Sequence, residues 1–187
     1  MPRNILFDLI APLYDRLISP RPPEDLLDVL KLPAAGKMLD ASGGTGRVSA
    51  ALQASVDSMV LNDLSQPMLV QAHAKGLDAT QAQAHHLPFP DGSFERVLMV
   101  DALHHIEGQR EAVEEMLRVL KPGGRLVIEE PDITLFRVKL IALGEKLMLM
   151  GSHFLSPKEI KACIEKLGYQ AQIQSDNEFA AWIIVDK

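Results

Sequence analysis

This sequence contains little cysteine and fewer basic than acidic residues, and each shortage excludes a class of protein. With one cysteine, Cys163, in 187 residues, the chain is expected to form neither an internal disulfide bond nor a thiolate metal cluster. Acidic residues outnumber basic ones by 25 to 19, and the formal net charge of -6 disfavours a surface that neutralises phosphates. We therefore expect no nucleic-acid partner.

Long apolar runs are missing as well. The most apolar stretch, 138–151, contains Lys139, Glu145 and Lys146 and is shorter than the ~20 apolar residues that span a bilayer. The N-terminus does not show the charged leader, apolar run and small-residue cleavage site of a signal peptide. These patterns predict a cytoplasmic protein without a transmembrane segment, and they leave peripheral contact with a membrane open.

What the sequence does contain is typical of one folded domain. Hydrophobic residues make up 47% and charged residues 24%, and the length fits a single domain, 1–187. Strand and helix patterns alternate from Lys37 onward. The strand-like ranges are 37–41, 58–62, 79–83, 94–100, 125–130, 169–174 and 179–185, and the helix-like ranges are 45–54, 66–74, 109–119 and 157–167. The alternation predicts an α/β fold with a mainly parallel seven-stranded sheet, helices on both faces and an antiparallel C-terminal hairpin at one edge.

Two apolar segments lie outside this alternation. Residues 1–23 form an N-terminal arm whose apolar residues recur at helical spacing, with Pro12 expected to kink the helix. The proline cluster "SPRPPED" joins the arm to the body. The second segment is 132–155. We expect both segments to lie over the strand ends, where folds of this kind acquire specificity.

The stretch "MLDASGGTG", residues 38–46, leads from a strand through a glycine cluster into a helix. In parallel sheets, ligands bind beyond the carboxyl ends of the strands, where glycines permit close approach and a helix N-terminus offers free N–H groups. The spacing Gly44-x-Gly46-x-x-Ser49 nearly fits a dinucleotide-binding turn, and Asp63 lies near the expected ~20-residue offset of a ribose-binding acid. Taken alone, this turn leaves a nicotinamide-dependent oxidoreductase open.

Several further motifs, in order, resemble the class I S-adenosylmethionine-dependent methyltransferases, especially small ones similar to ubiquinone/menaquinone C-methyltransferases. "LFDLIAPLYDRL" resembles their N-terminal helix, "MLDASGGTG" their first motif, and "LNDLSQPML" their second strand ending in an acid. "AHHLPFPDGSFERVLMVDALHHI" resembles the segment from the adenine-binding turn into strand four, and "RVLKPGGRLVIEEP" the turn into strand five. The resemblance runs from the arm to about Gly168. It implies S-adenosylmethionine as cofactor and S-adenosylhomocysteine as product.

The same resemblance assigns the cofactor to the first two strand ends. It places the methionine part against Asp40 and the glycines, the ribose hydroxyls on Asp63, and the adenine near Met68, Gln83 and Ala84. The expected cofactor-binding residues are Asp40, Ala41, Ser42, Gly43, Gly44, Gly46, Asp63, Leu64, Met68, Gln83 and Ala84. Gln83 stands where the family usually has an acid, although its carbonyl oxygen can still accept a hydrogen bond from an adenine amino group. Met68 fits simple core packing equally well.

Catalytic candidates follow strand four in "VDALHHI". Methyl transfer from a sulfonium needs alignment, exclusion of water and, for some acceptors, removal of a proton. Asp101 is the first candidate for base or substrate contact, and His104 and His105 follow. The alternative is that these side chains cap helix 109–119 or fasten the loop. Because no histidine pair comes with the acids or thiols of a metal site, we predict no metal.

The arm and segment 132–155 are expected to roof a pocket for a small aromatic or lipophilic acceptor. The expected substrate-binding residues are Phe7, Tyr14, Phe136, His153 and Phe154, with Leu140, Leu147, Met148 and Met150 in support. The alternative is that they only exclude water. "VDALHH" is not the Asn/Asp-Pro-Pro-aromatic turn of nucleic-acid amino methyltransferases, and a single cysteine does not suit arsenic methylation.

Three functions remain after these exclusions. An active small-molecule methyltransferase is favoured, and a regulatory or partner subunit that binds the cofactor without catalysis is second. The nicotinamide-dependent oxidoreductase is third, because only the glycine spacing supports it. The acceptor, the methylated atom and the oligomeric state do not follow from the sequence.

Overall fold

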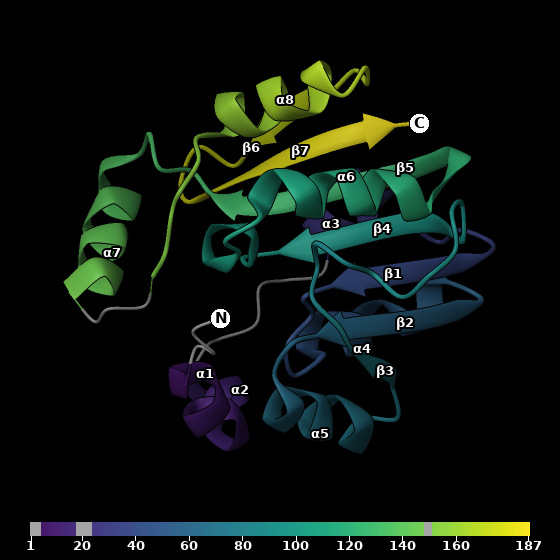
Figure 1. Cartoon of the computed structure of the whole chain (residues 1–187), viewed down its shortest axis with the longest axis horizontal. Coiled ribbons are helices and arrows are strands. Elements are labelled where there is room, and N and C mark those ends of the chain that lie inside the picture. Colours follow the sequence, from purple (N-terminus) through teal and green to yellow (C-terminus); the bar gives the residue numbers. More distant parts are fainter. Residues whose placement is uncertain (1–4, 18–23, 148–150) are drawn as a thin grey trace.

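A seven-stranded sheet organises the computed structural model, which describes residues 5–17, 24–147 and 151–187 (Figure 1). The strands are β1 Lys37–Ala41, β2 Ser58–Asp63, β3 Asp78–Gln81, β4 Phe94–Val100, β5 Leu120–Pro131, β6 Gln172–Ser175 and β7 Ala180–Asp186. Their order across the sheet is β3-β2-β1-β4-β5-β7-β6. Neighbours among β1 to β5 pair in parallel, whereas β7 is antiparallel to both β5 and β6. The predicted mainly parallel fold with an antiparallel C-terminal hairpin is confirmed.

Helices cover both faces of this sheet. They are α1 Ile5–Ile10, α2 Tyr14–Leu17, α3 Glu24–Leu30, α4 Arg47–Leu52, α5 Gln66–Ala74, α6 Gln109–Val119, α7 Phe136–Leu147 and α8 Pro157–Lys166, with 3₁₀ turns η1 Ala11–Leu13, η2 Gln53–Ser55 and η3 Leu103–His105. Buried residues of α6 and α8 share one core cluster, and those of α3, α4 and α5 share the other. Helices α3 and α7 were not among the helix-like ranges. None of the helices in the described parts of the chain is both long and apolar enough to cross a membrane.

Alternate residues of the central strands fill the two cores. In β1, Leu39 belongs to the cluster of α6 and α8, and Met38 to the cluster of α3, α4 and α5. Val97 and Leu98 divide in the same way in β4. Strands buried on both faces read as continuous apolar runs rather than as an alternation with a period of two. The packed sheet fixes the positions of the strand ends.

The carboxyl ends of β1, β2, β4 and β5 lie at one end of the molecule, and the arm and α7 lie at this same end (Figure 1). The arm consists of α1, η1 and α2, and Pro12 lies in the 3₁₀ turn between the two short helices. The expected interruption at Pro12 is therefore confirmed. Most of the proline cluster proposed as the joint lies outside the described residues.

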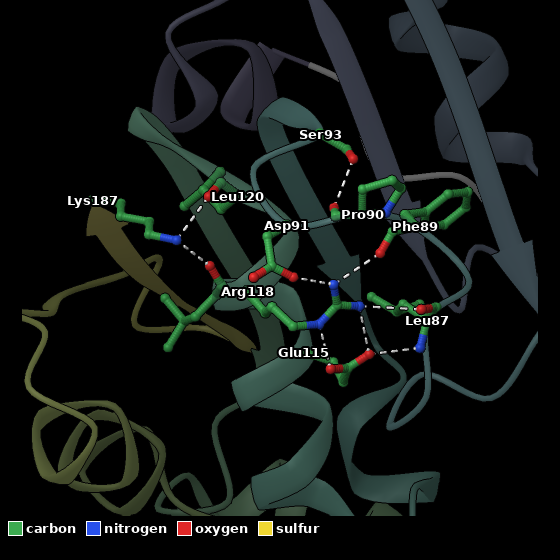
Figure 2. Close-up of polar contacts among 10 residues, drawn as sticks. Leu87, Phe89, Pro90, Asp91, Ser93, Glu115, Arg118, Leu120 and Lys187 are labelled. Carbon is green, nitrogen blue, oxygen red and sulfur yellow. Dashed lines mark hydrogen bonds and ion pairs between the residues drawn. The ribbon is translucent and has the colours of Figure 1, made fainter.

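The loop between β3 and β4 is fastened to α6 by one arginine (Figure 2). The Arg118 guanidinium donates to the carbonyl oxygens of Phe89 at 2.8 Å and Leu87 at 3.1 Å. Glu115 accepts from this guanidinium at 2.9 Å and from the Leu87 N–H at 2.8 Å. These bonds hold the loop that begins with the Gln83 turn against the body of the protein.

Candidate active site

The strand-end surface divides into two parts. The β1–β2 half comprises the glycine loop after β1 and the turn after β2, and the β4–β5 half comprises the turn after β4, the end of β5 and the segment 151–154. The N-terminal arm contacts both halves. Each half brings together a different part of the predicted site.

The glycine loop turns through backbone conformations that few side chains adopt. Ser42, Gly44 and Gly46 have φ angles of 60°, 58° and 73°. A Cβ on Gly46 would lie 2.3 Å from Leu77, and a Cβ on Gly43 would lie 2.6 Å from the Asp40 carboxylate. A Cβ on Gly44 would have nothing within 4 Å. A side chain at Gly43 or Gly46 would therefore displace the Asp40 or Leu77 side chain, whereas open space lies beside Gly44.

Asp40 is buried below this loop with an oxygen that lacks a partner. Its side chain is 1% exposed, and the Ser49 hydroxyl donates to Oδ2 at 2.6 Å. Its Oδ1 is buried without a hydrogen-bond partner in the described structure. Burial raises the pKa of Asp40 to about 7, against the opposing effect of the Ser49 hydrogen bond. A buried polar atom without a partner is costly and marks a position where a ligand donor fits.

Asp63 joins the glycine loop to the start of α5. Its Oδ2 accepts the Gly44 N–H at 2.9 Å, and its Oδ1 accepts the Ser65 N–H at 2.8 Å. Burial raises the pKa of this carboxyl group, although these backbone donors oppose the shift. A carboxylate has about four lone-pair positions, so Asp63 keeps the capacity to accept further hydroxyl protons.

Most of the remaining expected cofactor residues follow β2 or β3 in the chain. Ala84 is buried, Leu64 is exposed, and Met68 is buried (3%), as core packing would also require. Gln83 forms an isolated β-bridge with His86. The turn is tied to β2 because Asn62 donates through Nδ2 to the Ala82 carbonyl at 3.3 Å.

Asn62 was missed by sequence reasoning. It is completely buried at the end of β2, and its Oδ1 has no hydrogen-bond partner in the described structure. An asparagine inside an otherwise apolar strand was a usable signal, because a buried amide normally has partners for all its polar atoms.

In the β4–β5 half, Asp101 adopts a strained conformation. Its φ is 53°, an uncommon value for a residue other than glycine, and one associated with functional sites. Within the described part of the chain, its carboxylate has neither a hydrogen bond nor an ion pair. Burial raises the pKa of Asp101, while nearby His104 opposes the rise. Burial, and then Asp101, raise the pKa of the Tyr14 hydroxyl on the arm.

His104 is held from several sides. Its Nδ1 lies 2.6 Å from Glu130 Oε2, and Glu130 Oε1 accepts the N–H groups of Ala102 at 2.9 Å and Leu103 at 2.7 Å. The Phe154 ring stacks on the imidazole at 4.2 Å. Although burial opposes it, the Glu130 carboxylate raises the pKa of His104. With 2% exposure, His104 fits the alternative in which it fastens the loop better than it fits a base open to substrate.

His105 faces the two covering segments. Its ring lies 4.9 Å from that of Phe7, and its Nδ1 lies 3.1 Å from the Ser152 hydroxyl. That hydroxyl donates to Glu145 Oε2 at 2.5 Å. Burial, and then protonated His104, lower the pKa of His105 to about 3, so this imidazole is neutral near pH 7.

Glu145 creates a donor set that the sequence did not reveal. Ligand atoms of His104, His105 and Glu145 all lie within 4.8 Å of one another. However, the Ser152 hydroxyl already bridges Glu145 and His105, and Glu130 already holds Nδ1 of His104. The absence of a metal stays a prediction. Glu130 was signalled by two acids at the end of an apolar strand, whereas Glu145 and Ser152 come near only through the folded structure.

The arm reaches the β1–β2 half through two acids. Asp8 accepts the Ser65 hydroxyl at 2.6 Å, and Asp15 accepts the Thr45 hydroxyl at 2.5 Å. Lys75 lies 2.8 Å from Asp15. The arm therefore spans the surface from the glycine loop to the histidines.

Of the predicted acceptor residues, three are brought to the β4–β5 half. Phe7 and Phe154 contact the histidines, and Tyr14 lies 6.3 Å from Phe7 between ring centroids. Phe136 is 74% exposed, which does not fit an enclosed pocket, because the first turn of α7 directs it away from the body. His153 is an exposed residue whose N–H donates to the His104 carbonyl at 2.7 Å. Met148, Met150 and the Leu147 side chain lie outside the described parts.

The chain is also similar to known proteins. Residues 39–128 match a family described as a methyltransferase domain. A demethylmenaquinone methyltransferase of Clavibacter sepedonicus is 40% identical over 114 residues, which are 56% of this chain and 46% of that protein. The ubiquinone/menaquinone biosynthesis C-methyltransferase UbiE of Pseudomonas putida is 38% identical over 108 residues, 52% of this chain and 42% of that protein. The chain thus spans about half the length of these relatives.

A solved structure extends the similarity to the whole fold. A SAM-dependent methyltransferase from Thermotoga maritima superposes with a TM-score of 0.79 at 23% identity, covering 97% of both chains. At this identity the match concerns the fold, including the antiparallel strands at its edge.

Proposed function

We propose that this chain, which belongs to the class I S-adenosylmethionine-dependent methyltransferases, transfers a methyl group to a small aromatic or lipophilic acceptor. The observation that carries the proposal is the β1–β2 half. A buried carboxylate with an unpartnered oxygen lies below a glycine loop that has open space beside Gly44. Such a site offers a negative group to an ammonium and a close approach to a ligand.

The residues present fit the cofactor that the family uses. Asp40 would accept a donor from the methionine part, and Gly43, Gly44 and Gly46 shape the loop around it. Asp63 would accept the ribose hydroxyl protons, as its spare lone pairs permit. The adenine would be bordered by Met68, Gln83 and Ala84, and Ala41, Ser42 and Leu64 complete the expected cofactor-binding set. When bound, the cofactor supplies an activated methyl group on sulfur.

Asp101 is the residue that we assign to proton removal. It follows β4, is partly shielded from water and has no hydrogen-bond partner in the described structure, so its carboxylate can turn to an acceptor. Its raised pKa brings it nearer to neutral pH, where general bases act best. His104, which is hydrogen-bonded to Glu130, holds the turn after β4 in place. His105 lines the acceptor side as a neutral imidazole.

The rings near the turn after β4 support this acceptor class. Phe7, Tyr14, His105 and Phe154 present aromatic surface with one hydroxyl, as a pocket for a planar apolar molecule requires. The relatives are named as methyltransferases for demethylmenaquinone and for ubiquinone or menaquinone biosynthesis, which supports a quinone-like acceptor. His153 and Phe136 stay candidates for its outer rim. We also propose that the reaction needs no metal, because His105 and Glu145 are already linked by hydrogen bonds through the Ser152 hydroxyl.

A methyl-transfer screen tests this function. The full chain is incubated with labelled S-adenosylmethionine and a panel of phenols, hydroquinones and amines. We expect label on a hydroquinone or phenol, and Asp101→Asn should reduce transfer without changing S-adenosylhomocysteine affinity. Asparagine is the suitable replacement because it tolerates a positive φ. The exposed Asp78→Asn is the matched control, and label on none of the panel would support the non-catalytic alternative.

A further inference from the structure

Helix α7 carries an apolar stripe that faces away from the body. Phe136, Leu140 and Leu143 are spaced four and three residues apart and are 74%, 54% and 54% exposed. Such spacing places them on one side of a helix, because each residue advances it by about 100°. Val138, by contrast, is completely buried, and Glu145 is bonded to Ser152. The stripe is therefore opposite the side that packs on the protein.

Cations flank this stripe on both sides. At about 100° per residue, Arg137 falls on one side of the stripe, and Lys139 and Lys146 fall on the other. All three are exposed. Glu145 is the one acid in the helix sequence, and it is turned toward Ser152 and lies 3.9 Å from His104 Nε2. The outward side of α7 is thus apolar and positive, although the chain as a whole has a formal net charge of -6.

Helix α7 lies near the strand-end site. α7 projects at the end of the molecule where β1, β2, β4 and β5 terminate (Figure 1). The same end carries the arm, whose Leu9 and Leu13 are also exposed, at 75% and 50%. A surface at this end that contacts α7 would lie close to the strand-end site.

We infer that α7 docks the protein on an anionic lipid surface, with its apolar stripe in the headgroup region and its cations among lipid phosphates. Helices with one apolar side and flanking Lys or Arg bind in this way. A second copy of the chain fits the stripe less well, because pairing two α7 helices would bring six cations together. The inference concerns where the protein acts and stands independently of the acceptor that it methylates.

Vesicle flotation of the full chain tests this inference. The two preparations are pure phosphatidylcholine and an equal mixture of phosphatidylcholine and phosphatidylglycerol. We expect binding to the anionic vesicles that weakens with salt. Lys139→Glu with Lys146→Glu should weaken it by at least ~25-fold, at about fivefold per cation removed. Phe136→Ser with Leu140→Ser should weaken it by about tenfold or more through lost apolar burial.

Matched controls come from α8 and β6. Lys158→Glu with Lys166→Glu reverses two exposed cations on α8, and Ile173→Ser removes an exposed apolar side chain from β6. Both controls should bind like the unchanged chain. Binding of S-adenosylhomocysteine without vesicles is measured on the same samples. It reports folding and the proposed function independently of vesicle binding.

Any of three results would overturn the inference. The first is equal binding of the α7 variants and the controls, and the second is no binding of the unchanged chain to anionic vesicles. The third is a dimer in sedimentation that Phe136→Ser with Leu140→Ser converts to a monomer, since the stripe would then belong to a second copy.

Discussion

The two halves of the strand-end surface are built in different ways. The β1–β2 half is made by short sequence motifs whose residues lie close together in the chain, such as Asp40, Gly44 and Ser49. The β4–β5 half is made by residues that meet only in the folded structure: His104 bonds Glu130, 26 residues away, and Phe7 contacts His105. A local motif can place a cofactor, whereas acceptor specificity needs distant segments to converge. The two halves should therefore respond separately to substitution.

The largest expected effect is Gly44→Val, which should abolish cofactor binding. A side chain at this position would enter the open space beside the loop. Gly76→Val is the control, because Gly76 also has a positive φ, 79°, and nothing within 4 Å of a Cβ, but lies after α5. Both variants place a valine in a left-handed backbone conformation and are strained in the same way. Because only Gly44 borders the proposed cofactor site, only Gly44→Val should lose S-adenosylhomocysteine binding in calorimetry. Equal affinities would show that the space is not the cofactor's.

Deletion of residues 1–18 should separate the halves. The arm contacts the histidine side through Phe7, and its loss admits water and removes acceptor contacts, so transfer should be lost. Cofactor affinity should fall less than transfer, because Asp40, Asp63 and the glycines belong to the body, although the deletion removes the Asp8 and Asp15 hydrogen bonds to the β1–β2 half. Circular dichroism checks folding, and transfer is assayed with the acceptor found in the screen. Full activity would show that the arm does not cover the acceptor and would assign that role to 132–155. Loss of folding would show that the arm is needed for the fold, and would contradict the expected separate response of the two halves.

A smaller loss is expected for Asp63→Ala. It removes charge-assisted hydrogen bonds to the ribose, and affinity should fall by roughly 1.5–3 kcal/mol, or about 10- to 150-fold. Because Asp63 also bonds the Gly44 N–H, some of this loss would come from the loop itself. Asp78→Ala, at an exposed position on β3, is the control in calorimetry. An unchanged dissociation constant would rule the assignment out.

The smallest effect is a pH dependence confined to the β1–β2 half. Asp40 has a pKa of about 7, raised by burial and by Asp63 and opposed by Ser49 and Arg47. An ammonium ligand favours the carboxylate, so affinity should increase as pH rises through about 7, by at most ~10-fold per unit. The free energy of unfolding of the ligand-free protein should fall as pH rises from the ordinary aspartate pKa to about 7. In this range the folded form still holds the Asp40 proton that the unfolded form has released. Asp40→Asn should flatten both profiles, measured by calorimetry and thermal unfolding.

The sequence predicted more of one half than of the other for a physical reason. The seven strands, the glycine loop and the acids at the ends of β1 and β2 are encoded locally, by apolar runs and turn residues. Glu145 and Ser152 reach the histidines because α7 folds back beside the turn after β4, and no local pattern specifies that return. Phe136 shows the same limit: an apolar residue in a covering segment was assigned to the pocket, yet the helix turns it outward.

Calorimetric titration of the full chain with S-adenosylhomocysteine and with NAD tests the central claim most directly. We predict one S-adenosylhomocysteine site per chain that Gly44→Val abolishes and Gly76→Val preserves, and no binding of NAD. Binding of NAD in the absence of S-adenosylhomocysteine binding would contradict the assignment of the glycine loop and the acids Asp40 and Asp63 to a methyl-donor site.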